Sequence, residues 1–207
     1  ISDKIIDGVF LANHDTGRAA GYLHYNDMNV KFGAALQLFT PGKAFVYYGD
    51  ELGMTGSGPK DEDKRAPMYW TSGTSSEMTK GPAGMEPKEH KFPAYDVQKD
   101  DPNSVYNYYK KALLIRNAFP SIARGTPAVM EEVTTQNGNL YATSRTIDGE
   151  TVYVIFNIDN MNPATVTVSK ATYPYSGIAA TLNVGTEDAT ISGETLTIPA
   201  FGCVILK

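Results

Sequence analysis

Near its start the chain carries an apolar run that ends abruptly in polar side chains, Val9-Phe10-Leu11-Ala12-Asn13-His14-Asp15-Thr16-Gly17-Arg18. An amide, an imidazole, a carboxylate and a guanidinium follow the apolar residues closely. Short apolar runs of this kind are typical of strands buried in a parallel sheet. Because ligands of parallel α/β proteins bind where such strands end, the cluster predicts an active site.

A helix and a second apolar strand follow this cluster. The helix is predicted over Asn29–Phe39, because apolar residues recur there at helical spacing until Pro41-Gly42 ends it. The next apolar run, Ala44–Tyr48, leads into Asp50-Glu51. Together with the first strand, Val9–Ala12, these elements predict a βαβ unit whose two parallel strands end at the same rim.

A long segment separates the second strand from the next predicted helix. It spans about fifty residues rich in Gly, Pro, Met and charge, and loops of this length are usually functional or disordered. We favour a functional loop, because residues 61–70 combine an acidic cluster, one arginine and an aromatic pair that could line a polar cleft. The helix is predicted over Asn103–Phe119, with Asn103 or Ser104 as its N-cap and Pro120 as its end.

The sequence pattern of the remaining residues is typical of an all-β domain. Turn signals such as Asn137-Gly138 and Asp148-Gly149 separate short alternating runs, which predicts an antiparallel β-sandwich. We place the domain boundary between residues 1–122 and 123–207. A structural module and a carbohydrate-contacting surface both remain open for the second domain. The predicted strands are Ala128–Thr134, Leu140–Thr146, Thr151–Ile158, Ala164–Val168, Glu194–Pro199 and Gly202–Lys207.

The composition limits the classes of molecule that the chain is expected to bind. The 207 residues carry a formal net charge of -5 without a run of lysine or arginine, which argues against nucleic acid or an anionic membrane as the main partner. A neutral or cationic small ligand fits better. No apolar run approaches the roughly 20 residues of a membrane span. The single cysteine, Cys203, lies in an apolar run and is expected to be a buried small hydrophobe.

Three motifs in a fixed order carry a resemblance to a known family. They are residues 10–18, then Pro41-Gly42-Lys43-Ala44-Phe45-Val46-Tyr47-Tyr48-Gly49-Asp50-Glu51-Leu52-Gly53-Met54, and then Arg65-Ala66-Pro67-Met68-Tyr69-Trp70. They closely resemble the C-terminal part of the α-amylase family of glycoside hydrolases. The resemblance covers the whole chain and implies α/β plus all-β architecture: the last two βα units of a (β/α)8 TIM barrel, then the all-β domain. Bacterial α-amylases look most similar, with α-glucosidases and oligo-1,6-glucosidases next.

The resemblance implies retaining hydrolysis of α-glucosidic bonds in starch or maltooligosaccharides. Asp15 matches the third carboxylate of the family, which binds sugar hydroxyls and favours the oxocarbenium-like transition state. His14 matches its neighbour, a hydrogen-bond donor to the same sugar, and Asn13 is assigned to substrate binding with it. Arg65 resembles the arginine that binds the terminal glucose in exo-acting relatives, against the alternative of an exposed loop charge. The alternative for residues 13–15 is a capping and turn cluster.

The remaining polar residues near these motifs are not assigned to sugar binding. Arg18 is expected to pair with a carboxylate of the site or to form a surface salt bridge, and Asp50 is expected at the rim with a structural role. No cofactor is predicted in this chain. Calcium is possible in a full-length enzyme, but Asp61 and Asp63 lack an EF-hand pattern and are interpreted as a solvated acidic run.

The sequence therefore predicts a fragment of an exported or cell-surface bacterial enzyme, inactive alone because the family's nucleophile and acid lie on earlier barrel strands. Two alternatives stay open: a protein that binds glucan without cleaving it, and an interaction module that completes another chain's barrel. The expected partners are the α-glucan substrate and either the missing N-terminal barrel or another copy of the chain. Either one would cover the exposed strands.

Overall fold

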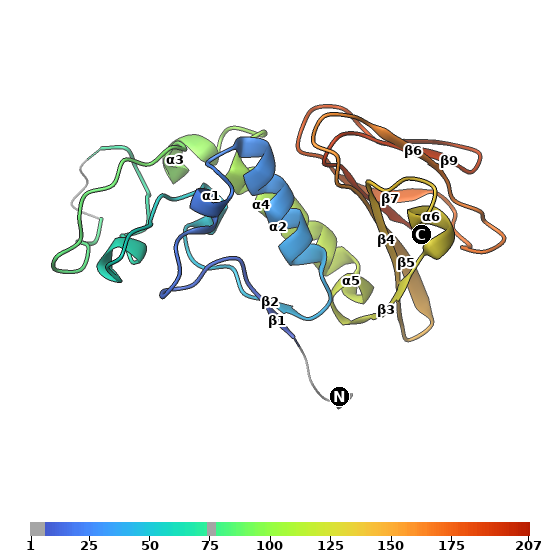
Figure 1. The fold of residues 1–207 in the computed structure, drawn as a ribbon, viewed down its shortest axis with the longest axis horizontal. Coiled ribbons are helices and arrows are strands. Elements are labelled where there is room, and N and C mark those ends of the chain that lie inside the picture. The colour runs from blue at the N-terminus through green and yellow to red at the C-terminus, as the bar shows by residue number, and fades with distance from the viewer. Residues whose placement is uncertain (1–6, 74–77) are drawn as a thin grey trace. The chain divides into compact units, whose positions relative to one another are not determined.

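The computed structural model describes residues 7–73 and 78–207 (Figure 1). By its internal contacts the chain divides into two compact units. The first unit comprises Gly8–Gln37 and Ala44–Lys110. The second unit comprises Leu38–Lys43 and Lys111–Lys207, with Asp7. The polar cluster of residues 13–18 belongs to the first unit, and all strands from residue 126 onward belong to the second.

Two short strands, β1 (Gly8–Val9) and β2 (Lys43–Ala44), pair with each other. Lys43 N–H donates to the Asp7 carbonyl at 2.9 Å and Phe45 N–H to the Val9 carbonyl at 2.8 Å. Both partners advance by two residues in the same direction, so the pair is parallel, as the βαβ pattern predicted. Its extent was predicted wrongly: the apolar runs Val9–Ala12 and Ala44–Tyr48 continue beyond the ladder, because within the described residues β1 and β2 pair with no other strand.

The helix between these strands, α2 (Asp27–Phe39), confirms the helix predicted over Asn29–Phe39 and begins two residues earlier. The Asn26 side chain accepts a hydrogen bond from Asn29 N–H at 3.0 Å, which caps the first turn. Its apolar face is buried, as expected, through Val30, Ala34, Ala35, Leu38 and Phe39. A short helix, α1 (Ala19–Tyr22), precedes it directly after the polar cluster.

The long segment folds around two single-turn 3-10 helices, η1 (Asp50–Leu52) and η2 (Glu62–Lys64), and the short helix α3 (Tyr95–Gln98). The following helix, α4 (Val105–Ala118), confirms the predicted helix. Of the two candidate N-caps the structure selects Ser104, whose Oγ accepts from Asn107 N–H at 3.1 Å. Pro120 does not only end the preceding helix: it begins α5 (Pro120–Arg124), at a first-turn position that proline tolerates.

The strands of the second unit form two antiparallel sheets. A five-stranded sheet has the order β3-β4-β5-β10-β7, and a three-stranded sheet has the order β6-β9-β8. Val204 lies opposite Ile155 on one side and Thr181 on the other. The strands are β3 (Thr126–Val129), β4 (Leu140–Ile147), β5 (Glu150–Asn157), β6 (Ala164–Thr167), β7 (Ile178–Leu182), β8 (Thr190–Ser192), β9 (Thr195–Ile198) and β10 (Cys203–Leu206).

One buried cluster joins the two sheets. It takes Ala142, Ile155 and Val204 from the larger sheet and Val166 and Leu196 from the smaller one. Buried and exposed residues alternate along β6, whereas every residue of β10 is buried. The cluster also includes Met130, Val133, Leu140, Tyr153, Ala164, Val168, Tyr175, Ala189, Ile198 and Leu206.

The predicted strand Ala128–Thr134 is wrong in its second half. Its last residues form the helix α6 (Glu131–Thr134), and the buried Met130 lies at the change of direction. Met130 N–H still donates to the Ala142 carbonyl at 3.0 Å, so the ladder ends there. Cys203 is buried in β10, as expected. No helix within the described residues is long and apolar enough to span a membrane.

Candidate active site

The loop that follows β1 is organised by Asn13. Its Oδ1 accepts from Asp15 N–H at 2.8 Å and from Thr16 N–H at 3.0 Å, while Thr16 Oγ1 accepts from Asn13 N–H at 3.0 Å. This is an Asx-turn, in which a short side chain takes the place of a backbone acceptor. Hydrogen bonds within the loop itself therefore fix the backbone that carries His14 and Asp15.

Asp15 lies between two cationic or protonatable groups. Arg65 Nη2 is 3.3 Å from its Oδ1, and His14 Nε2 is 3.2 Å from its Oδ2. The Asp15 side chain is 63% exposed, so a ligand can reach the carboxylate while Arg65 and His14 hold it. The structure thus brings all four predicted site residues together, since Arg65 Nε also donates to the His14 carbonyl at 3.2 Å and Asn13 shapes the turn.

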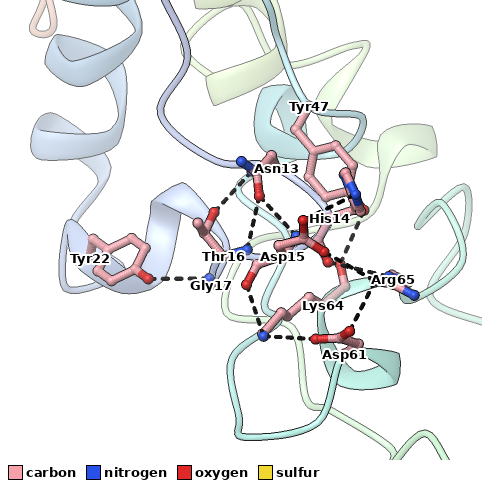
Figure 2. A network of polar contacts seen from close by, with 10 residues as sticks. All are labelled: Asn13, His14, Asp15, Thr16, Gly17, Tyr22, Tyr47, Asp61, Lys64 and Arg65. Atoms are coloured by element: carbon pink, nitrogen blue, oxygen red, sulfur yellow. Dashed lines mark hydrogen bonds and ion pairs between the residues drawn. The ribbon is translucent and has the colours of Figure 1, made fainter.

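Two residues that sequence reasoning did not assign to the site complete this network (Figure 2). Lys64 Nζ donates to the Asp15 carbonyl at 2.9 Å and lies 3.2 Å from Asp61 Oδ1. The other carboxylate oxygen of Asp61 lies 3.2 Å from Arg65 Nη2. The hydrogen bond and charge of Lys64, together with the charge of Arg65, hold the pKa of Asp61 below its usual value. Asp61 therefore links both cations that contact Asp15.

Arg18 is buried, and its charge acts on the carboxyl groups of Asp50 and Glu51. Its side chain is 1% exposed, and its guanidinium carbon lies 4.3 Å from the ring centre of Tyr47 and 4.5 Å from that of Tyr48. It also donates to the Tyr48 carbonyl. Within residues 7–73 and 78–207, its Nε and Nη2 have no hydrogen-bond partner. The expected surface salt bridge is wrong, because stacking on the two rings draws the side chain inside.

The carboxyl group of Asp50 is also buried. Asp50 is 3% exposed, and the backbone N–H of Ala19 and the guanidinium of Arg18 lie close enough to favour its ionised form. Burial raises its pKa from 3.8 to about 7, although the nearby Arg18 opposes the shift. Its neighbour Glu51 accepts from Gly49 N–H at 2.8 Å, and burial raises the pKa of Glu51 as well.

The acidic segment was interpreted as solvated, and this is wrong for Asp63. Asp63 is 3% exposed, accepts from Glu86 N–H at 3.1 Å and lies 3.4 Å from Lys88 Nζ. The bond from Glu86 and the cation of Lys88 hold its pKa below the usual value. The segment before residue 90 is therefore tied to η2. In the part of the chain that the structure describes, no group of three His, Cys, Asp or Glu side chains could hold a metal ion.

A family model described as the catalytic domain of alpha amylase matches residues 1–125, more than half of the chain. The chain belongs to the α-amylase family. This confirms the resemblance that the three motifs indicated. The match includes every residue of the network around Asp15, so the network lies within the catalytic-domain region of an α-amylase family member.

Two curated α-amylases are similar to most of this chain. Alpha-amylase 3 of Dictyoglomus thermophilum is 32% identical over 159 residues, which are 75% of this chain and 30% of that protein. The alpha-amylase of Streptomyces lividans is 29% identical over 215 residues, covering 96% of this chain and 22% of that protein. The chain thus spans less than a third of the length of either relative.

A solved structure shows the same fold. Eubacterium rectale Amy13B is 36% identical to this chain and superposes with a TM-score of 0.91, over 100% of this chain and 40% of that one. Enzymes named oligo-1,6-glucosidases also match at lower identity. The mixture of helices and antiparallel sheets described above is therefore a fold of the α-amylase family.

Proposed function

We propose that this chain is part of a retaining glycoside hydrolase that cleaves α-glucosidic bonds in starch or maltooligosaccharides, with Asp15 as its transition-state-stabilising carboxylate. The observation that carries the proposal is the setting of Asp15: a 63% exposed carboxylate fixed between His14 and Arg65. The α-amylase family match of residues 1–125 supports it.

The chemistry follows from how charge develops in the reaction. The sugar ring gains positive charge in the oxocarbenium-like transition state. A carboxylate that accepts hydrogen bonds from ring hydroxyls binds more strongly as that charge grows, and only such a difference raises the rate. His14 and Arg65 hold the Asp15 carboxylate in one position, so little reorganisation is needed during the reaction. Their own donors extend the polar surface toward the sugar.

We also assign the barrel and sandwich architecture by this proposal. The parallel pair β1 and β2 would be part of the last two βα units of a (β/α)8 barrel, with residues 1–122 in the barrel and 123–207 in the β-sandwich. A cavity of about 300 Å³ is lined by residues that directly follow the two strands, and Phe10 and Phe45 in its wall are 51% and 59% exposed. Such a face needs cover. We propose that barrel strands from an N-terminal part of the enzyme, or a second copy, cover it.

Two parts of the proposal rest on the family resemblance. The nucleophile and the acid belong to earlier strands of the barrel, so this chain alone would not hydrolyse a glucan. Export to the cell surface or medium of a bacterium is the localisation we propose. The preference for α-1,4 or α-1,6 bonds would be tested by measuring hydrolysis of substrates of both kinds.

The test is the Asp15→Asn variant of the complete polypeptide that the gene encodes. The amide keeps the shape but loses the charge, so kcat on maltooligosaccharides should fall by about 10²- to 10³-fold. The matched control is Asp148→Asn in the turn between β4 and β5, where Asp148 has a φ of 50° that asparagine also tolerates. A near-normal kcat for Asp15→Asn would remove Asp15 from the site. Absence of hydrolysis by the unmutated polypeptide would refute the enzymatic function.

A further inference from the structure

The imidazole of His90 binds the backbone shortly after η1, within the first unit. Its Nδ1 accepts a hydrogen bond from Thr55 N–H at 3.1 Å. The two residues are 35 positions apart, so this bond ties the segment before α3 to the segment after η1. One face of the imidazole packs on Tyr69, with ring centres 4.1 Å apart and an angle of 31° between the ring planes. The imidazole is therefore held both at its edge and on its face.

The bond to Thr55 requires one protonation state of His90. A backbone N–H can donate only to an imidazole nitrogen that carries no proton. The neutral imidazole can offer Nδ1 as that nitrogen, with its proton on Nε2, whereas both nitrogens carry protons in the imidazolium. Protonation of His90 would therefore set two N–H groups against each other and break the bond to Thr55.

The surroundings of His90 favour the neutral imidazole as well. Burial lowers its pKa, and the positive charge of Arg18 lowers it further. The nearby carboxylate of Glu89 is paired with Lys91 at 2.9 Å. Protonation is therefore disfavoured while the segment stays in place. The other titratable groups on the neighbouring elements are Asp50 and Glu51 on η1, Asp63 on η2, Tyr69 and Lys88.

The backbone that His90 holds is connected directly to the loop of the candidate site. Gly56, next to Thr55, accepts a hydrogen bond from Arg18 N–H at 2.7 Å. A Cβ at Gly56 would lie 2.7 Å from Arg18 Cγ, so the two backbones approach closely. Arg18 lies in the same loop as Asp15, three residues further along. Two hydrogen bonds, joined by the peptide between Thr55 and Gly56, therefore connect His90 to this loop.

We propose that His90 is a positioning residue for the loop that carries Asp15, and that it acts only as the neutral imidazole. When the imidazole gains a proton, the segment of Thr55 and Gly56 loses its anchor and Arg18 N–H loses a fixed acceptor. The carboxylate of Asp15 is then held less firmly. For its effect on catalysis the inference rests on the proposed function, in which a misplaced carboxylate stabilises the transition state less.

Two substitutions in the complete polypeptide separate the proton from the hydrogen bond. His90→Asn keeps an acceptor, because Oδ1 of asparagine can take the place of Nδ1, but asparagine does not titrate. His90→Ala removes the acceptor at every pH. The matched control is His24→Asn, since His24 is exposed and its φ of 59° is one that asparagine tolerates. His14 is present in every variant, so differences between them do not report on it.

Hydrogen exchange of the Thr55 and Arg18 amides between about pH 5 and pH 8, corrected for the intrinsic exchange rate, measures the positioning directly. In the unmodified protein the protection of both amides should fall by up to about tenfold for each pH unit below about 6.5, because the opened segment binds a proton that the closed one refuses. In His90→Asn the protection should not depend on pH, and in His90→Ala it should be low throughout. His24→Asn should behave as the unmodified protein does.

Activity gives a second measurement. On maltooligosaccharides, kcat of the unmodified polypeptide should fall more steeply below about pH 6.5 than kcat of His90→Asn. An equal loss of amide protection in the unmodified protein and in His90→Asn would overturn the role of the proton. Loss of protection at Thr55 with full protection at Arg18 would overturn the positioning. A polypeptide that shows the expected exchange but hydrolyses no maltooligosaccharide would refute the proposed function and leave the positioning by His90 standing.

Discussion

Replacing Asp50 with asparagine should change how the stability of the protein depends on pH. Asp50 is buried, and the backbone of Ala19 and the charge of Arg18 only partly offset the cost of burying its carboxylate. Burial raises its pKa from 3.8 to about 7 in the folded protein. The charged groups around it are Arg18 and Glu51, and the buried Tyr109 hydroxyl is also within electrostatic reach.

The sign follows from proton binding. Between about pH 4 and pH 7 the unfolded chain has released the Asp50 proton, whereas the folded protein keeps it. The free energy of unfolding therefore falls as pH rises through this window. About three pH units at about 1.4 kcal/mol each give a loss of about 4 kcal/mol. The amide of Asp50→Asn does not titrate, so the difference between variant and unmodified protein should move by about 4 kcal/mol in favour of the variant.

Urea unfolding of the complete polypeptide at several pH values between about 4 and 8 measures this difference. The control is Asp63→Asn, because the pKa of Asp63 is lowered by the bond from Glu86 and by Lys88. Its carboxylate stabilises the fold above the unfolded pKa, so that variant should lose stability relative to the unmodified protein as pH rises from acid. A difference for Asp50→Asn that stays constant across the window would refute the burial argument.

Two further substitutions test the packing of each unit. Asn157→Ala should lower the free energy of unfolding by about 3 kcal/mol in urea titrations, because the buried Nδ2 donates to the carbonyls of Asn162 and Pro199 at 2.8 and 3.0 Å; an effect below about 1 kcal/mol would contradict this. Gly53→Ala should lower the melting temperature, since its φ is 63° and a Cβ would lie 2.5 Å from the Phe92 ring. Gly138→Ala, with nothing within 4 Å, is the matched control.

The sequence predicted best those elements whose pattern is local. The helices α2 and α4 and the strands β4 and β5 follow from apolar periodicity and from turn residues beside them. The strands β7 and β8 were not predicted. In β7, the residues Ala179, Ala180 and Thr181 give little apolar alternation. Strand pairing determines the conformation of this segment instead. β7 is a strand because it pairs with β10, with Thr181 opposite Val204.

The short pair β1 and β2 shows the opposite case. The hydrophobicity of each run predicted a strand over its whole length. A strand forms, however, only as far as its backbone pairs with a neighbouring strand. Among the described residues each of these strands has one neighbour, and the rings of Phe10 and Phe45 at the ends of the two strands are exposed. We expect both runs to lengthen where further strands pair with them.

Only part of the network around Asp15 could be predicted from the sequence, because some of its contacts are local and others join distant residues. Asn13, His14 and Asp15 are adjacent, and their turn depends on their own side chains, so the motif alone located them. The contact between Asp15 and Arg65 joins residues 50 positions apart. A signal for the missed residues was nevertheless present. Asp61 lies three and four residues before Lys64 and Arg65, a spacing that puts one carboxylate beside both cations on a helical turn. An acidic residue at this spacing before two cations can therefore be solvated and still hold both cations in place.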